Sequence, residues 1–215
     1  MTRPPPAESA LVTGPDGTLE LLIDAPATVK GIALVAHPHP LFGGANTNKI
    51  AHTLARTFRD LGYVALRPNF RGVGQSAGTH DHGIAETEDM LAVVAWAQSR
   101  WGALPLAIGG FSFGAFVQTR VAKRLAEGMT PVNRMVLVGT AAGQVTGARS
   151  YVTEPVPADT LVIHGELDET VALANVLDWA RPQDLPVVVI PGADHFFHGK
   201  LHLIRDQMLR LWQPL

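Results

Sequence analysis

Short apolar runs alternate along the chain with longer segments in which apolar residues recur at helical spacing. A short continuous apolar run is typical of a strand buried on both faces of a sheet. The runs that predict such strands are residues 31–36, 63–67, 104–108, 134–138, 160–164 and 187–190. The segments that predict helices are residues 50–61, 85–100, 113–127, 171–180 and 198–212. This alternation predicts an α/β fold with a mostly parallel sheet and helices on both of its faces.

Two further strands precede this alternation. Residues 9–13 and 18–24 flank Gly14-Pro15-Asp16-Gly17, which favours a tight turn, so they predict an antiparallel hairpin. The predicted sheet then has about eight strands in a single domain that spans residues 1–215. The Pro-rich residues 1–8 are expected to form a loose terminus.

Composition narrows the class of protein. Charged residues make up 17% of the chain and hydrophobic residues 47%, which excludes a disordered chain and indicates a well-buried core. The formal net charge of −2 argues against broad electrostatic binding of nucleic acid or anionic lipid. No apolar run approaches the ~20 residues that span a bilayer, and the start lacks the apolar segment of a signal peptide. We therefore expect a cytoplasmic protein without nucleic-acid or membrane partners, for which a homodimer is possible.

The pattern G-x-S-x-G occurs twice, around Ser112 and around Ser76. A serine nucleophile on this pattern requires a strand, a sharp turn that carries the serine, and then a helix. Ser112 follows an apolar strand and precedes a predicted helix, whereas loop sequence lies on both sides of Ser76. Ser112 is therefore the predicted nucleophile, and Ser76 is interpreted as a loop residue.

Serine requires a base that takes its proton and an acid that orients the base. In this architecture the acid and the base follow later strands, in the order Ser, Asp or Glu, His. Asp168 and His195 satisfy both conditions and are the predicted acid and base. The alternatives are Glu166 or Glu169 as the acid and His198 as the base; His164 is interpreted as a packed core or rim residue.

Together these motifs resemble the α/β-hydrolases, and more narrowly the small bacterial hydrolases related to the dienelactone hydrolase group. The segments that carry the resemblance are residues 37–44 (HPHPLFGG), 67–78 (RPNFRGVGQSAG), 109–114 (GGFSFG), 164–168 (HGELD) and 192–197 (GADHFF). The resemblance implies Ser112, Asp168 and His195 as a catalytic triad. Dienelactone hydrolases proper use a cysteine nucleophile, and this chain has no cysteine, so their substrate does not carry over.

Attack by Ser112 places negative charge on the carbonyl oxygen, which two backbone N–H groups typically stabilise. One predicted donor is Phe113, the residue after the nucleophile. The second comes from the loop after residues 31–36, where Pro38 and Pro40 have no N–H. The resemblance implies His39 for this role, with Leu41 as the alternative.

The pocket is expected to be open. Only about twenty residues separate the strands at 134–138 and 160–164, too few for a helical lid, so we expect no cap domain and residues 140–157 as a mobile rim. Phe42, Phe196 and Phe197 lie near the predicted catalytic loops and are candidate pocket residues.

No metal or cofactor is expected. The His37-x-His39 pair has no nearby acidic ligand and is interpreted as part of a rigid turn, and His80-Asp81-His82 as a solvated loop. The predicted function is a serine carboxylesterase that acts on a small-molecule acyl substrate. A thioesterase, a lactonase, a short-peptide hydrolase and a ligand-binding protein on the same fold are the alternatives.

Overall fold

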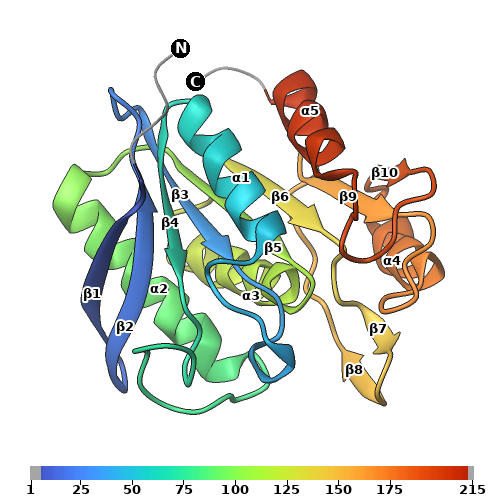
Figure 1. Cartoon of the computed structure of the whole chain (residues 1–215), viewed down its shortest axis with the longest axis horizontal. Coiled ribbons are helices and arrows are strands. Elements are labelled where there is room, and N and C mark those ends of the chain that lie inside the picture. Colours follow the sequence, from blue (N-terminus) through green and yellow to red (C-terminus); the bar gives the residue numbers. More distant parts are fainter. Residues whose placement is uncertain (1–5, 213–215) are drawn as a thin grey trace.

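The structure, a computed structural model, describes residues 6–212 of the chain. Its main sheet has eight strands in the order β1-β2-β4-β3-β5-β6-β9-β10, of which β1 and β2 pair antiparallel to their neighbours and the rest are parallel (Figure 1). The strands of this sheet are β1 (Glu8–Gly14), β2 (Gly17–Asp24), β3 (Gly31–Ala36), β4 (Tyr63–Pro68), β5 (Leu106–Phe111), β6 (Arg134–Val138), β9 (Leu161–Gly165) and β10 (Val187–Ile190).

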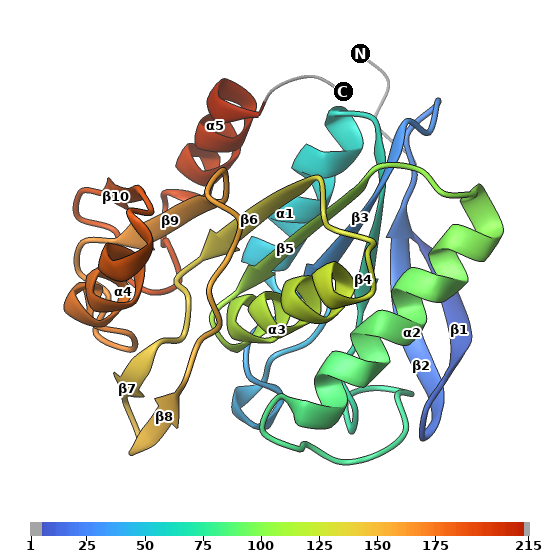
Figure 2. The ribbon, with the colours of Figure 1, turned by 180° about the vertical axis from the view of Figure 1, so that it is seen from behind.

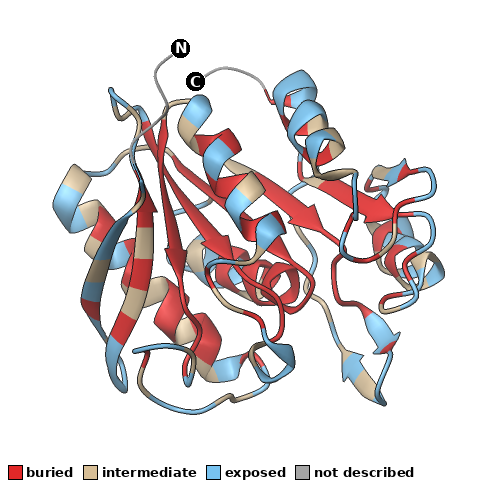
Figure 3. Cartoon of the chain, in the orientation of Figure 1, coloured by how far each residue is buried: buried red, intermediate tan, exposed pale blue. Residues whose placement is uncertain are grey.

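Helices cover both faces of the sheet (Figures 1 and 2). The helices of one face are α1 (Lys49–Asp60) and α5 (Leu201–Leu211), and those of the other are α2 (Ile84–Trp101), α3 (Phe113–Glu127) and α4 (Leu173–Ala180). The central strands are buried along their length, while the outer faces of the helices are exposed (Figure 3). The arrangement confirms the predicted α/β fold.

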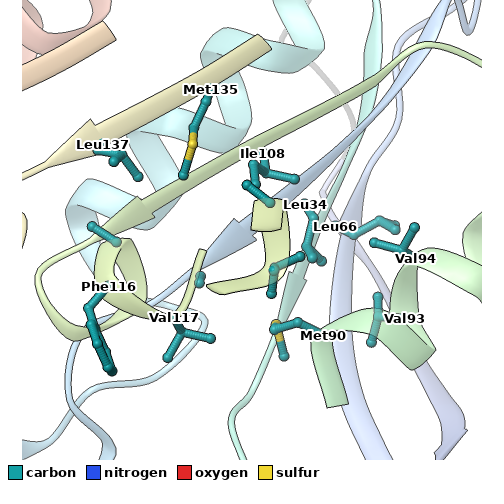
Figure 4. Packing of buried hydrophobic residues seen from close by; sticks show 14 of the residues in the cluster. Leu34, Leu66, Met90, Val93, Val94, Ile108, Phe116, Val117, Met135 and Leu137 are labelled. Atoms are coloured by element: carbon teal, nitrogen blue, oxygen red, sulfur yellow. The ribbon is translucent and has the colours of Figure 1, made fainter. Parts of the chain in front are cut away.

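Alternation along the strands divides the core into two clusters. In β3, Ile32 and Leu34 face α2 and α3, whereas Ala33 and Val35 face α1 and α5, because successive side chains of a strand point to opposite faces. Figure 4 shows the first of these clusters, in which Leu34 lies among side chains of β5, α2 and α3. A strand buried on both faces needs apolar residues at every position, which is why these strands are continuous apolar runs.

Several predicted boundaries are wrong. β5 begins at Leu106 rather than at residue 104, because Pro105 has no N–H to pair, and it runs on through Gly109 and Gly110 to Phe111. The predicted loose terminus is too long, since Glu8 already pairs with Ile23. Residues 1–5 of that predicted terminus lie outside the described residues.

The segment between β6 and β9 contains a hairpin that the sequence did not predict, β7 (Gly143–Val145) and β8 (Arg149–Tyr151), and no helical lid within the described chain. Two short 3-10 helices, η1 (Pro40–Phe42) and η2 (Arg181–Gln183), were also not predicted. Over residues 6–212, no helix has the length and apolar character needed to cross a membrane.

Candidate active site

Ser112 occupies a sharp turn between β5 and α3. Its backbone has φ +56° and ψ −119°, a conformation that is costly for a residue with a side chain. The flanking glycines make the turn possible: a Cβ on Gly110 would lie 2.6 Å from the backbone of Gly114, and one on Gly114 would lie 2.3 Å from the carbonyl oxygen of His37. The G-x-S-x-G pattern is therefore a requirement of close backbone packing at this point.

The structure brings the three predicted residues together. Nε2 of His195 lies 3.0 Å from Oγ of Ser112, and Nδ1 of His195 lies 2.7 Å from Oδ2 of Asp168. Because the carboxylate only accepts, Nδ1 of the neutral ring carries the proton and Nε2 is left to accept from the serine hydroxyl. The other oxygen of Asp168 accepts from the N–H groups of Thr170 and Val171, at 2.9 and 2.8 Å, which fixes the orientation of the carboxylate.

The alternative acids and nucleophile have structural contacts elsewhere. Ser76 Oγ donates to Asn69 O and accepts from the N–H of Glu20, so it holds a loop against β2. Glu166 accepts from the N–H of Gly192, and Glu169 is exposed.

Neither the alternative base His198 nor the predicted core residue His164 is hydrogen-bonded to Ser112. His198 is exposed and pairs with Asp194, whose pKa it lowers. His164 is fully buried, and its Nε2 donates to Val171 O at 2.9 Å and lies 3.5 Å from Oδ2 of Asp168. Burial lowers the pKa of His164, so the ring is neutral where it packs beside the carboxylate of Asp168.

The loop after β3 places a second N–H group near the serine turn. His39 caps η1: its Nδ1 accepts from the N–H of Leu41 at 3.3 Å, and its carbonyl oxygen accepts from Phe42 and Gly44. The N–H of the alternative donor Leu41 is therefore engaged with the His39 ring. Among residues 6–212 the N–H groups of His39 and Phe113 have no protein acceptor. These two are the predicted pair.

Comparison with known proteins identifies the family. Residues 19–143 match the sequence model of X-Pro dipeptidyl-peptidase (S15 family). The chain belongs to this family. A solved structure from Xanthomonas campestris, described as an α/β serine hydrolase without a lid, is 34% identical to this S15-family chain, with a TM-score of 0.86 over 99% of this chain and 98% of the other. An α/β serine hydrolase homologue from Coxiella burnetii is also 34% identical, with a TM-score of 0.84 over 99% and 100%.

Two curated relatives add to this result. An uncharacterized protein from Rickettsia prowazekii is 32% identical over 87% of the S15-family chain and 81% of its own length. The lysophosphatidylserine lipase ABHD12 of Macaca fascicularis is 35% identical over 53% of this chain, which corresponds to only 28% of that lipase. The protein is thus a serine hydrolase with the α/β-hydrolase fold, without a lid over residues 6–212, and the predicted resemblance is confirmed.

The predicted pocket residues of this S15-family hydrolase have different environments. Phe42 and Phe196 are 68% and 50% exposed and are available to a ligand. The side chain of Phe197 is fully buried in the core beneath α1 and α5. Phe196 and Phe197 are both among the residues that line a cavity of about 380 Å³ between the start of α1 and the loop after β10.

The sequence did not indicate a group of ring and cationic side chains beside the serine turn. The His39 ring lies 4.6 Å from that of His80, 4.8 Å from that of Phe42 and 4.9 Å from that of Phe113. Arg149 covers the other side of Phe42, 4.3 Å from the ring centroid. These residues come from four separate segments, and no spacing in the sequence relates them.

The histidines of the His37-x-His39 and His80-Asp81-His82 segments have contacts of their own. Both nitrogens of His37 are hydrogen-bonded, to Pro38 O and to the N–H of Phe70, and the ring of His39 turns toward η1. His80 pairs with the fully buried Glu86, at 2.7 Å. Within residues 6–212, no group of three or more metal-ligating side chains is arranged to hold an ion.

Proposed function

We propose that this S15-family protein is a carboxylesterase that cleaves small or accessible acyl esters through an acyl-enzyme on Ser112. The observation that carries the proposal is the hydrogen-bonded series Ser112–His195–Asp168, at an edge of the sheet that no helical lid covers in the described chain. A serine hydroxyl becomes nucleophilic when a base lies within hydrogen-bond reach and a third group orients that base.

The geometry supports a two-step reaction. As Oγ of Ser112 attacks the carbonyl carbon, Nε2 of His195 takes the hydroxyl proton, and the N–H groups of Phe113 and His39 stabilise the oxyanion. Collapse of the tetrahedral intermediate breaks the carbonyl–oxygen bond to the alcohol, which leaves with the proton from His195. Water then attacks the acyl-enzyme by the same route, and the carboxylic acid and free Ser112 are the products.

Asp168 has an orienting role in this proposal. Its carboxylate keeps the proton on Nδ1 of His195 and stabilises the imidazolium that forms during each step. Asp168→Asn is expected to lower kcat by about 10³-fold or more, because the amide favours the wrong tautomer. Glu169→Gln, a matched change at the next position, is expected to leave kcat within about twofold.

A peptide substrate is the second candidate, because the matched family is named for X-Pro dipeptidyl-peptidase. Such a substrate has a free N-terminal ammonium group, which a carboxylate binds best. The side chains that lower the pKa of the His39 ring, besides burial, are instead basic, namely His80, Arg149 and His82. This environment disfavours an ammonium group, and the relative ABHD12 is named as a lipase, an ester hydrolase. Both points support ester over peptide hydrolysis.

Fluorophosphonate labelling and a substrate panel test the proposal. The panel contains p-nitrophenyl esters, a thioester, a lactone and an X-Pro p-nitroanilide. Wild type is expected to react with the probe and to hydrolyse the esters fastest, and Ser112→Ala is expected to lose labelling and at least about 10³-fold in kcat/KM. Ser76→Ala is the matched control, since it changes the serine of the other G-x-S-x-G pattern.

Three outcomes would overturn the proposal. Undiminished labelling of Ser112→Ala would exclude this serine as the nucleophile. Faster turnover of the anilide than of any ester would make the protein a peptidase. Absence of labelling and of turnover in wild type would favour a ligand-binding protein on the hydrolase fold.

A further inference from the structure

The β7–β8 hairpin has a fixed position at the rim of the site. It projects from the edge of the sheet toward which β6 points (Figure 2). Thr146 Oγ1 donates to the carbonyl oxygen of Glu169 at 2.8 Å, and Asn175 Nδ2 of α4 donates to Gln144 O. Because Glu169 directly follows Asp168, these bonds connect the hairpin to the loop that carries the proposed acid.

Arg149, the first residue of β8, extends over the loop that carries the proposed oxyanion donor. Its Cζ lies 4.3 Å from the centroid of the Phe42 ring, and that ring lies 4.8 Å from the ring of His39. Nε and Nη2 donate to Thr146 O, at 3.2 and 2.8 Å, which sets the plane of the guanidinium. Over residues 6–212, no carboxylate forms an ion pair with Arg149, and Tyr151 is a further hydrogen-bond partner of its guanidinium.

The surroundings of Arg149 leave its charge uncompensated. The neighbouring rings of His39, His80 and His82 lie in contact with one another, at 4.6 and 4.9 Å between centroids. Burial, together with the nearby His80, Arg149 and His82, lowers the pKa of His39 to about 4. Glu86 is fully buried and pairs with His80, so it does not neutralise the guanidinium.

We propose that Arg149 binds an anionic group of the substrate, and that the preferred substrates are esters with a carboxylate or phosphate a short spacer away from the scissile carbonyl. This inference rests on the proposed esterase function and specifies its substrate class. The guanidinium donates hydrogen bonds to the anion, and Phe42 supports it by a cation–π contact. A hydrogen bond to a charged group of this kind changes affinity by about tenfold or more.

Matched pairs of esters test the subsite. Monomethyl adipate is compared with methyl hexanoate, and 1-butyryl-glycerol 3-phosphate with monobutyrin, by acid release in a pH-stat. The measured quantity is the kcat/KM ratio of the anionic ester to its neutral partner. This ratio is expected to fall about tenfold or more in Arg149→Met, mainly through KM, because methionine retains the apolar stem but not the charge.

A second arginine and added salt supply the controls. Arg100→Met makes the same charge change at the end of α2, where Arg100 packs on Trp96 and Trp101, and should keep the wild-type ratio. Salt at 0.5 M should lower the ratio of wild type but not that of Arg149→Met. A purely structural role of Arg149 would not produce this salt dependence.

The two pairs of esters identify where the anion lies in the substrate. A lower kcat/KM ratio in Arg149→Met for the adipate pair indicates a carboxylate on the acyl side. A lower ratio for the phosphate pair indicates an anion on the alcohol side. If the ratio in Arg149→Met stays within twofold of that of wild type for both pairs, the subsite is overturned. The esterase proposal still holds in that case, provided that hydrolysis of the neutral esters depends on Ser112. Loss of all ester hydrolysis in wild type would instead overturn the esterase proposal, and the subsite with it.

Discussion

The ring of His37, at the end of β3, should make a defined contribution to the pH dependence of the protein's stability. The ring is fully buried; Phe70 donates its N–H to Nε2 at 2.9 Å, and Nδ1 donates to Pro38 O at 2.7 Å. The bond from Phe70 exists only for the neutral ring, because a protonated Nε2 cannot accept. Burial lowers the pKa of His37 from 6.5 to about 4, and the bond to Pro38 opposes this change in part.

The sign and size of the effect follow from proton linkage. In the unfolded chain His37 has its ordinary pKa, so the unfolded state binds a proton at a pH where the folded state does not. The contribution to stability is complete above about pH 6.5 and is lost as the pH falls toward 4. Between pH 7 and pH 5 this one ring should remove about 2 kcal/mol from the free energy of unfolding.

Urea unfolding, followed by tryptophan fluorescence at pH 7 and pH 5, measures this loss. His37→Gln does not titrate, and its amide oxygen can still accept from the N–H of Phe70. The variant is expected to be less stable than wild type at pH 7 by about 1 kcal/mol, since the bond to Pro38 is lost. Its further loss on going to pH 5 should be about 2 kcal/mol smaller than that of wild type.

His198→Gln is the matched control, because the side chain of His198 is 77% exposed and the change should leave the pH dependence of wild type intact. If His37→Gln does not fold, His37→Asn takes its place. NMR titration of the His37 ring in wild type measures its pKa without any variant. Equal losses in wild type and in the His37 variant between pH 7 and pH 5 would refute the reasoning.

Two further predictions concern packing and charge. Gly114→Ala should destabilise the protein by about 3 kcal/mol or more, because the new Cβ would lie 2.3 and 2.5 Å from backbone oxygen atoms. Gly128→Ala is the control, since its Cβ would meet ordinary contacts at 3.6 Å, and it should change stability by less than about 1 kcal/mol. Thermal unfolding of the two variants measures the difference. Asp24→Ala should lower the free energy of unfolding in urea by about 3–5 kcal/mol, because it leaves the buried Arg67 without its carboxylate partner at 2.8 Å. Asp60→Ala removes an ion pair at the surface and should lower it by less than about 1 kcal/mol. Equal losses in the two variants would contradict this account.

The fold was predictable from sequence where one physical cause dominates. A parallel strand between two layers of helices must be apolar throughout, so β3, β4, β6, β9 and β10 follow directly from the pattern. The proposed triad could be located for a related reason. Strand ends of a parallel sheet lie at one edge, so polar residues that follow different strands are brought together there.

The missed features depend on long-range contacts. The strands of the β7–β8 hairpin have only three residues each, too few to show a period, and contacts with α4 and with the loop after β9 hold them. Phe197 is a pocket residue by its position in the chain, yet its side chain is buried in the core, at a residue with φ +52°. Arg149 is a single arginine in a turn, and its neighbours come from other loops.

Two parts of the site are therefore held in different ways. On one side, Gly114 of the serine turn touches the carbonyl oxygen of His37, and the His37 ring binds the backbone at Phe70, so the turn and the proposed oxyanion loop form one rigid unit. On the other side, the hairpin with Arg149 is held by hydrogen bonds to the loop after β9 and by Tyr151, whose ring packs on those of Phe113 and Phe116. A substitution of Arg149 can thus alter which ester binds without moving the Ser112 turn, whereas substitutions at Gly114 or His37 affect folding before they affect specificity.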